Sequence, residues 1–371
     1  MKHFRYKNLL IYSSLQSVGH VEDYFVEHTE KLVVFIVMPR PKSRFNIIRL
    51  YNKGKLANEK KTWSVENFIL YYLTWYLTYL YIIFRYFSPQ EHFVVFSGQI
   101  FSFFGMSVQK IFRRVDFAYW LGDYFPPNTW TLRVYEWAKK FYHDRIRWTC
   151  YLSDRENKIL NGRIIDEMNK KTVMWGVKSK EIVRRSPSGT RLTFLFVGLV
   201  RPSQGLELIF QYLKHHPKCR IKIIGICDNE ALFQRYQAMI KNLGIAAQVY
   251  FPNKFFTDKE LTEISRDCHV GVAPYHLGPT HAEYYGDPGK IKTYAELGLP
   301  IIISNTTAII PYIRRFHSGE IIQRNVKDVE RAVSSIRRNY SSYIKGVSQF
   351  NKFFSYESYY RNKFSFLESD T

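Results

Sequence analysis

Residues 287–304 limit the fold more than any other segment, because the start of a helix and a buried strand follow each other within it. Asp287 can cap this helix, Pro288 suits its first position, and Gly289 leaves room for a ligand beside the backbone. Lys290 adds a full positive charge to the free N–H groups and the positive end of the helix dipole. The segment therefore predicts a site for a phosphorylated ligand.

From residue 191 onward, strand-like and helix-like segments alternate with short turns, which is typical of a parallel sheet with helical crossovers. The expected strands are residues 192–197, 220–226, 248–251, 269–275, 300–304 and 320–323. The expected helices are residues 205–215, 229–243, 258–267, 288–297, 307–316 and 326–339. This half is predicted to be a doubly wound α/β domain over residues 190–340.

The N-terminal half gives weaker signals, and residues 1–185 are interpreted as a second Rossmann-like domain. Its expected parallel strands are residues 8–13, 31–38, 92–97 and 116–120. The polar segment 184–190 is expected to link the two domains. Residues 350–367 alternate aromatic and charged residues at helical spacing, and we expect the tail, residues 345–371, to pack back on the first domain.

Composition narrows the classes of partner. The 371 residues suffice for two domains of about 150 to 200 residues each. A formal net charge of +22 indicates an acidic partner, such as a phosphorylated substrate, an anionic membrane or nucleic acid. No known nucleic-acid module is visible, so nucleic acid is not expected.

The four cysteines form no CxxC pair, which favours buried thiols in a reducing compartment over a metal or redox site.

Residues 68–87 are long enough to cross a bilayer and contain a single charge, Arg85. Six tyrosines interrupt the apolar run and favour a helix that packs on the domain or lies at an interface. A surface patch that dips into lipid and a true membrane span remain as alternatives. Basic residues shortly before the segment strengthen the interfacial interpretation, and they are Lys53, Lys55, Lys60 and Lys61.

Three motifs in the C-terminal half occur in an informative order: FVGLVRPSQGLELI, VYFPNKFFTDKELTEISRDCHVGVAPY and DPGKIKTYAELGLPIIIS. With these motifs, this half resembles the nucleotide-sugar domain of GT-B glycosyltransferases, especially the retaining enzymes of family 4. The N-terminal half resembles that fold in outline only. The resemblance implies an α/β protein in which two Rossmann-like, doubly wound domains face a central cleft.

The resemblance also implies which residues hold the donor. Leu199 and Gln204 occupy positions where family members commonly have Arg and Lys, and Arg201 could replace one of those charges. Lys290 matches the lysine at the family's helix start. The implied donor-binding residues are Gly198, Arg201, Gly205, Asn253, Pro288, Gly289, Lys290 and Thr293.

Several positions depart from the family pattern. Tyr285 and Thr293 stand where two glutamates usually hold the donor, and Gly122 replaces a histidine beside Asp123. Asp123 is expected to bind the acceptor, while Lys290 and Arg201 are expected to balance the charge on the departing phosphate. In a retaining transfer, that phosphate oxygen can take the acceptor proton. The chain has no Asp-x-Asp motif, so neither a metal nor a cofactor beyond the donor is expected.

The expected function is transfer of a hexose from a nucleotide-diphosphate sugar to a lipid-linked or cell-surface polysaccharide precursor. The expected location is the cytoplasm of a bacterium, peripherally on the inner face of the cell membrane. A non-catalytic GT-B relative that binds a nucleotide or glycan remains the alternative, because of the altered Arg, Lys, Glu and His positions.

Overall fold

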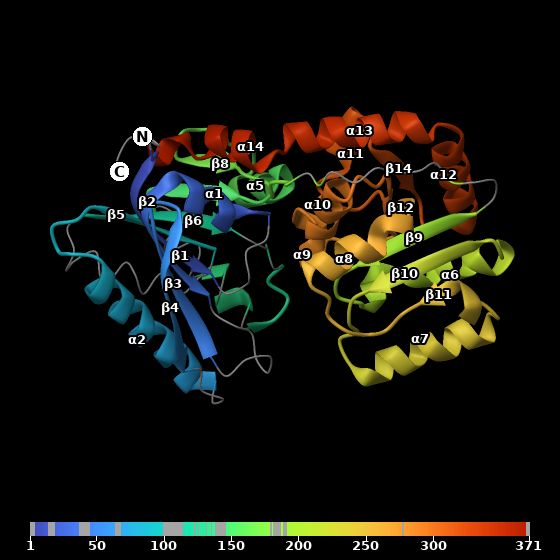
Figure 1. The fold of residues 1–371 in the computed structure, drawn as a ribbon, viewed down its shortest axis with the longest axis horizontal. Coiled ribbons are helices and arrows are strands. Elements are labelled where there is room, and N and C mark those ends of the chain that lie inside the picture. The colour runs from blue at the N-terminus through green and yellow to red at the C-terminus, as the bar shows by residue number, and fades with distance from the viewer. Residues whose placement is uncertain are drawn as a thin grey trace. The chain divides into compact units, whose positions relative to one another are not determined.

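A computed structural model gives the fold of the protein (Figure 1). It describes residues 4–13, 19–36, 45–63, 68–98, 114–121, 124, 126–130, 132–134, 136–137, 146–178, 180, 187, 191–276 and 278–368. The chain forms two compact units. Unit 1 comprises residues 1–176 and 356–371, and unit 2 comprises residues 177–355. The expected linker, residues 184–190, lies outside the described residues except for Pro187.

Unit 2 contains a six-stranded sheet whose strands are all parallel, in the order β11-β10-β9-β12-β13-β14. The strands are β9 (Leu192–Val197), β10 (Cys219–Ile224), β11 (Val249–Tyr250), β12 (Val270–Ala273), β13 (Ile301–Ser304) and β14 (Gly319–Ile322). All six strands expected from the sequence form. Strands β12 and β13 are buried along their whole length, as expected for a parallel sheet covered on both faces.

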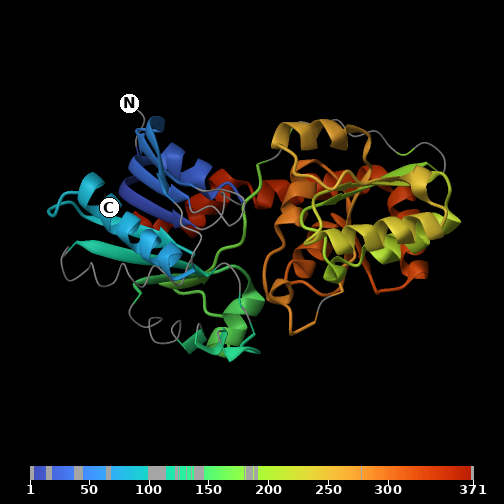
Figure 2. The same ribbon diagram turned by 90° about the horizontal axis from the view of Figure 1, so that it is seen from below.

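Helices cover both faces of this sheet (Figure 2). They are α6 (Leu206–His215), α7 (Glu230–Asn242), α8 (Asp258–Ile264), α9 (Ala282–Tyr285), α10 (Gly289–Glu296), α11 (Ile310–Phe316), α12 (Val326–Arg338) and α13 (Tyr340–Phe353). Helices α6, α7 and α12 share one hydrophobic core with β9 and β10. The Thr257–Glu260 capping box expected at the start of α8 is present.

Unit 1 contains an eight-stranded sheet in the order β4-β3-β2-β1-β5-β6-β7-β8. The strands are β1 (Tyr6–Ser13), β2 (Thr29–Ile36), β3 (Phe45–Asn52), β4 (Lys55–Trp63), β5 (Phe93–Ser97), β6 (Val115–Leu121), β7 (Trp148–Tyr151) and β8 (Lys170–Thr172). The four expected strands correspond to β1, β2, β5 and β6. Strands β3 and β4 form an antiparallel hairpin at one edge, which the sequence analysis did not predict.

The helices of unit 1 include α1 (Val21–His28), α2 (Phe68–Tyr86), α5 (Asp154–Asn161) and α14 (Tyr356–Lys363). The expected helix over residues 68–87 is α2, which packs one face on the sheet through Trp75, Tyr79, Ile82 and Ile83. Within the described ranges, no helix has the length and apolar character needed to cross a membrane.

The C-terminal tail is divided between the units. Residues 345–353 complete α13 in unit 2, which ends at Ser355, whereas residues 356–371 belong to unit 1. In unit 1, Tyr360, Phe364 and Leu367 are fully buried in the core formed by α1 and the central strands. The last part of the tail is therefore a structural part of the N-terminal unit.

Candidate functional site

The candidate site lies in unit 2, at the point where the order of the strands in the sheet reverses. From β9 the chain moves outward to β10 and β11, and then returns to β12 on the other side of β9. The turns that follow β9 and β12 therefore leave the carboxyl ends of these two strands in opposite directions. Ligands of doubly wound proteins bind at such a switch point.

Tyr294 of α10 holds the two strands at this point. Pairing between β9 and β12 is limited to Phe194 with Val270 and Leu195 with Gly271. Beyond this pairing, the Tyr294 hydroxyl accepts a hydrogen bond from the Val197 N–H (3.1 Å) and donates one to the Val272 carbonyl (2.9 Å).

Gly271 makes room for the Tyr294 ring, because a Cβ at position 271 would lie 2.3 Å from the ring. Tyr294 is not among the residues predicted from the sequence. The glycine inside an otherwise β-branched strand was the available signal.

The turn after β9 lies against the start of α10. Gly198 has φ 108° and Gly205 has φ 69°, values that favour glycine. A Cβ on Gly205 would lie 2.0 Å from the Pro274 carbonyl oxygen, so this turn touches the chain leaving β12. The Lys290 ammonium donates a hydrogen bond to the Gln204 side-chain oxygen. The structure thus brings Gly198, Gly205 and Lys290 together.

Lys290 has an unusual environment for a cation. Its Nζ lies 3.9 Å from the centre of the Phe196 ring and 5.3 Å from that of Tyr275. Burial lowers the pKa of Lys290 to about 7, although the nearby Glu283 carboxylate acts to raise it. In the described part of the chain, no carboxylate lies within ion-pair distance of this ammonium. An incoming anion would supply the missing negative charge.

Arg201 lies in the same turn but already has carboxylate partners. Its Nε donates to both carboxylate oxygens of Asp228, at 3.2 and 2.9 Å, and its Nη1 donates to Glu283 at 3.4 Å. A phosphate would have to compete with these two carboxylates for Arg201. Lys290 is therefore the better placed of the two cations expected at the site.

The predicted cap of α10 is wrong. Pro288 occupies the N-cap position, and no side-chain cap is seen among the residues that the structure describes. Asp287 instead forms a buried ion pair with Lys292 (3.2 Å), whose Nζ lies 3.3 Å from the centre of the Phe354 ring. The Asp287 carboxylate is thus paired with Lys292, and the first turn of α10 begins two residues later, at Gly289.

Two further predicted residues support the backbone around the site. Thr293 donates a hydrogen bond from its hydroxyl to the Gly289 carbonyl (3.3 Å). Asn253 adopts φ 50°, and its side-chain oxygen accepts a hydrogen bond from the Cys227 N–H (2.8 Å). This bond ties the loop after β11 to the loop after β10. Asp123 lies outside the described residues.

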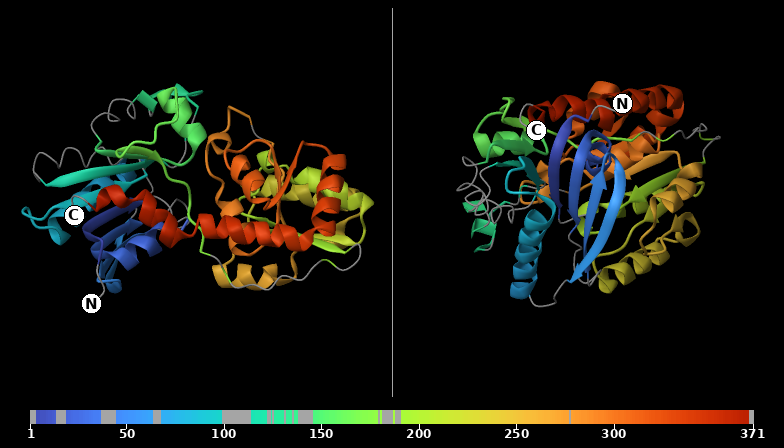
Figure 3. Two further views of the ribbon diagram at one scale, coloured as in Figure 1. Left: turned by 90° about the horizontal axis from the view of Figure 1, so that it is seen from above. Right: turned by 60° about the vertical axis from the view of Figure 1, so that its left-hand side comes forward.

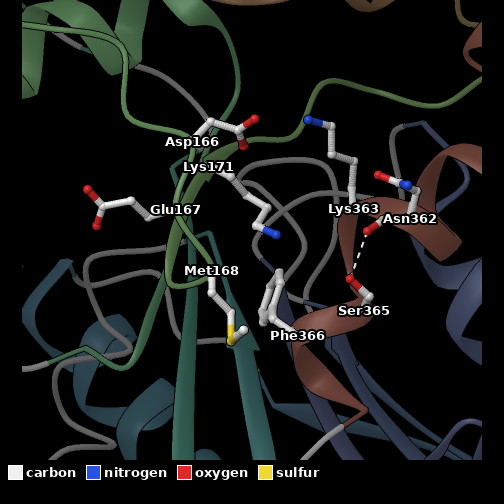
Figure 4. Close-up of a pocket in the computed structure, with 8 residues that line it drawn as sticks. All are labelled: Asp166, Glu167, Met168, Lys171, Asn362, Lys363, Ser365 and Phe366. Carbon is white, nitrogen blue, oxygen red and sulfur yellow. Dashed lines mark hydrogen bonds between the residues drawn. The ribbon is translucent and has the colours of Figure 1, made fainter.

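Unit 1 contains a hollow of about 530 Å³ between β8 and the C-terminal segment (Figure 4). Its walls include Asp166, Lys171, Lys363 and Phe366. The Lys171 ammonium lies 5.3 Å from the centre of the Phe366 ring. Carboxylates and lysines line it together, so it lacks the unbalanced positive charge seen at Lys290.

A comparison of the sequence with protein-family models also points to unit 2. Residues 178–346 match the family model described as Glycosyl transferases group 1. The protein is a glycosyltransferase. The matched range includes every described donor-side residue named above. No curated protein sequence matches the chain.

Solved structures with similar folds cover both units of this glycosyltransferase. Sucrose-phosphate synthase from Thermosynechococcus elongatus matches with a TM-score of 0.69 and 13% identity, over 96% of this chain and 99% of that one. Anabaena HepE in complex with UDP-glucose matches with a TM-score of 0.65 and 11% identity, over 97% and 99% of the two chains.

The catalytic domain of starch synthase IV from Arabidopsis thaliana, bound to ADP and acarbose, gives a TM-score of 0.67 and 9% identity, over 98% and 99%. With these matches, the fold is GT-B.

In the described residues, no group of three or more His, Cys, Asp or Glu side chains could hold a metal ion.

Proposed function

We propose that the protein transfers a hexose from a nucleotide-diphosphate sugar to a lipid-linked or cell-surface polysaccharide precursor. In this proposal the transfer retains the anomeric configuration, needs no metal ion and takes place on the inner face of the cell membrane. The observation that carries the proposal is the start of α10: its first turn has no side-chain cap, and Lys290 beside it has no carboxylate partner in the described part of the chain.

The donor diphosphate would lie between the first turn of α10 and the turn at residues 198–205. Backbone N–H groups and the helix dipole would bind the phosphates, and Lys290 would supply a full charge. Positive charge counts most when the bond to the sugar breaks, because negative charge then grows on the departing phosphate. That phosphate oxygen would also take the proton from the acceptor hydroxyl, so a strong protein base is not required.

The structures bound to UDP-glucose and to ADP support a nucleotide donor, and they differ in the base. Thermal unfolding with UDP, ADP, GDP and CMP would identify the base, because a ligand that binds the folded state raises the melting temperature.

The test is the replacement Lys290→Met, followed by calorimetric titration with the nucleoside diphosphate that stabilises the wild type most. We expect a loss of about 1.5 to 3 kcal/mol in binding free energy, the usual contribution of a hydrogen bond to a charged group. Lys214→Met removes the same charge from the exposed far end of α6 and should leave binding unchanged. Equal affinities in the Lys290 variant and the wild type would contradict the proposed site.

A further inference from the structure

Helix α2 of unit 1 has an outer face that no part of the proposed reaction uses. Its exposed large residues are Leu70, Leu73, Leu77, Tyr81 and Phe84, and we call them the outer stripe. They are between 38% and 60% exposed and follow one another at spacings of three and four residues. This spacing places them along one side of the helix.

The outer face of a helix that covers a sheet is normally polar. The opposite face of α2 is already buried, because Trp75, Tyr79 and Ile82 pack in the core of unit 1. In the right-hand view of Figure 3, α2 stands beside the strands of unit 1. The outer stripe is thus an apolar surface in addition to the one that holds α2 in place.

Positive charge accompanies the outer stripe. Lys60 of β4 donates a hydrogen bond to the Tyr81 hydroxyl (3.1 Å) and its Nζ lies 4.8 Å from the centre of that ring. Arg85 is exposed next to Phe84, and α2 contains no Asp or Glu. The acidic residue nearest to Lys60 along β4 is Glu59, and it pairs with Arg49 (2.8 Å).

We propose that the outer stripe of α2, with Lys60 and Arg85, docks the protein on an anionic lipid bilayer. The stripe extends over about 21 Å of helix, so α2 would lie flat in the interface with its leucines and Phe84 in the acyl region. Lys60 and Arg85 would bind the acidic headgroups. Tyr81, with an apolar ring and a polar hydroxyl, suits the boundary between the two layers.

The position of α2 gives this docking a use. Strand β4 is parallel to β1, so α2 begins just beyond the carboxyl ends of the parallel strands of unit 1. Ligands of α/β sheets bind at that edge. A lipid-linked acceptor in the bilayer would therefore be held near it. This inference rests on the membrane location in the proposed function, but not on the donor or the reaction.

The test is sedimentation of the full chain with vesicles of phosphatidylcholine and phosphatidylglycerol in a 3:1 ratio. We expect binding at low salt that weakens, but persists, as salt rises, because screening removes only the electrostatic part. The double variant Leu73→Gln/Leu77→Gln should bind about a hundredfold more weakly, at about tenfold for each exposed leucine lost. Lys60→Gln should bind about fivefold more weakly at low salt.

The matched control is Ile159→Gln/Ile164→Gln, which removes two equally exposed large apolar residues from α5 and the loop after it. It should bind vesicles like the wild type. Equal binding by the control and the Leu73/Leu77 variant would overturn α2 as the docking surface. A dimer in light scattering that the Leu73/Leu77 variant dissociates would also overturn it, because a second copy would then cover the stripe.

Calorimetry with the nucleotide separates this inference from the proposed function. The Leu73/Leu77 variant should keep the affinity and the melting temperature of the wild type, which excludes misfolding as the cause of lost vesicle binding. Failure of the wild type to sediment overturns the docking and leaves the donor site untouched. Vesicle binding without nucleotide binding overturns the donor site and leaves the docking in place.

Discussion

In the proposed donor site, Lys290 would couple ligand binding to its own protonation. Its pKa of about 7 in the free protein results from burial beside two aromatic rings, with an amide oxygen as its hydrogen-bond partner. A bound diphosphate would favour the charged ammonium and raise this pKa. In the proposed site, binding of a diphosphate above pH 7 would therefore require uptake of a proton.

We expect the affinity for a nucleoside diphosphate to fall by about tenfold per pH unit between pH 7.5 and 9. The sign follows because the free protein loses the Lys290 proton in this range while the complex keeps it. Calorimetry at several pH values, in buffers of different ionisation enthalpy, would measure both the affinity and the proton uptake. The Lys290→Met variant should show weak affinity without this slope, and a flat profile for the wild type would contradict the assignment.

Lys292, two residues along α10, behaves differently from Lys290. Burial lowers the pKa of Lys292 to about 8, although its partner Asp287 acts to raise it. The sequence revealed Lys290 through the helix start around it. It could not reveal Lys292, because the Phe350 and Phe354 rings that enclose its ammonium come from α13 and the turn after it, far along the chain.

Replacing Asp287 by Asn should destabilise unit 2 by about 3 to 5 kcal/mol, because Lys292 would stay buried without its charge partner. The double variant Asp287→Leu/Lys292→Met removes both charges and should recover much of this loss. Urea unfolding would provide the free energies. A double variant as unstable as Asp287→Asn would show that packing, and not the ion pair, sets the cost.

At the scale of elements, the turn from β9 to α6 is fixed by lack of space as well as by backbone angle. Gly205 and Gly244 share φ 69°, but a Cβ would clash with the Pro274 carbonyl at Gly205 and meet nothing within 4 Å at Gly244. The two glycines therefore form a matched pair for testing how tightly the loops of the candidate site pack.

Gly244→Ala should cost about 1 to 2 kcal/mol, the penalty of a left-handed backbone for a residue with a Cβ. Gly205→Ala should cost clearly more, because the turn must also move away from the loop after β12. Thermal unfolding of both variants gives the comparison, and nucleotide binding should weaken only in Gly205→Ala. Equal losses of stability would mean that the turn relaxes freely.

The sequence predicted the elements of unit 2 well because each strand there is a short apolar run between turn residues. It missed the β3–β4 hairpin because β4 is an exposed edge strand without an apolar period. The turn offered the remaining signal: Lys53 and Gly54 both have positive φ, as in the two-residue turns that favour hairpins. Such turns usually have Asn or Asp before the glycine, so Lys53 made the turn hard to recognise in the sequence.

At the scale of the whole molecule, the division into units differs from a simple order along the chain. The first unit ends at Gly176, before the expected linker, and regains residues 356–371 after unit 2 is complete. The alternation of aromatic residues in the tail predicted packing. It could not show where the tail leaves one unit for the other, because both stretches have the same helical spacing.

A chain ended after Ser355 should lose stability in unit 1, because Tyr360, Phe364 and Leu367 would leave its core. Scanning calorimetry should show an earlier transition for unit 1 and an unchanged transition for unit 2. The nucleotide identifies the second transition by raising it. A chain ended after Glu368 keeps these residues and should behave like the wild type. Unchanged transitions in the shorter chain would contradict a structural role for this segment.

The late return of residues 356–371 to unit 1 also bears on biosynthesis. Domains usually fold in the order in which the ribosome makes them, at about 5 to 20 residues per second. Here the first unit must wait for all of residues 177–355, which at that rate takes roughly ten to forty seconds. During this delay the core residues that Tyr360 and Phe364 will cover stay exposed on the nascent chain. A chaperone that binds aromatic segments would bind there.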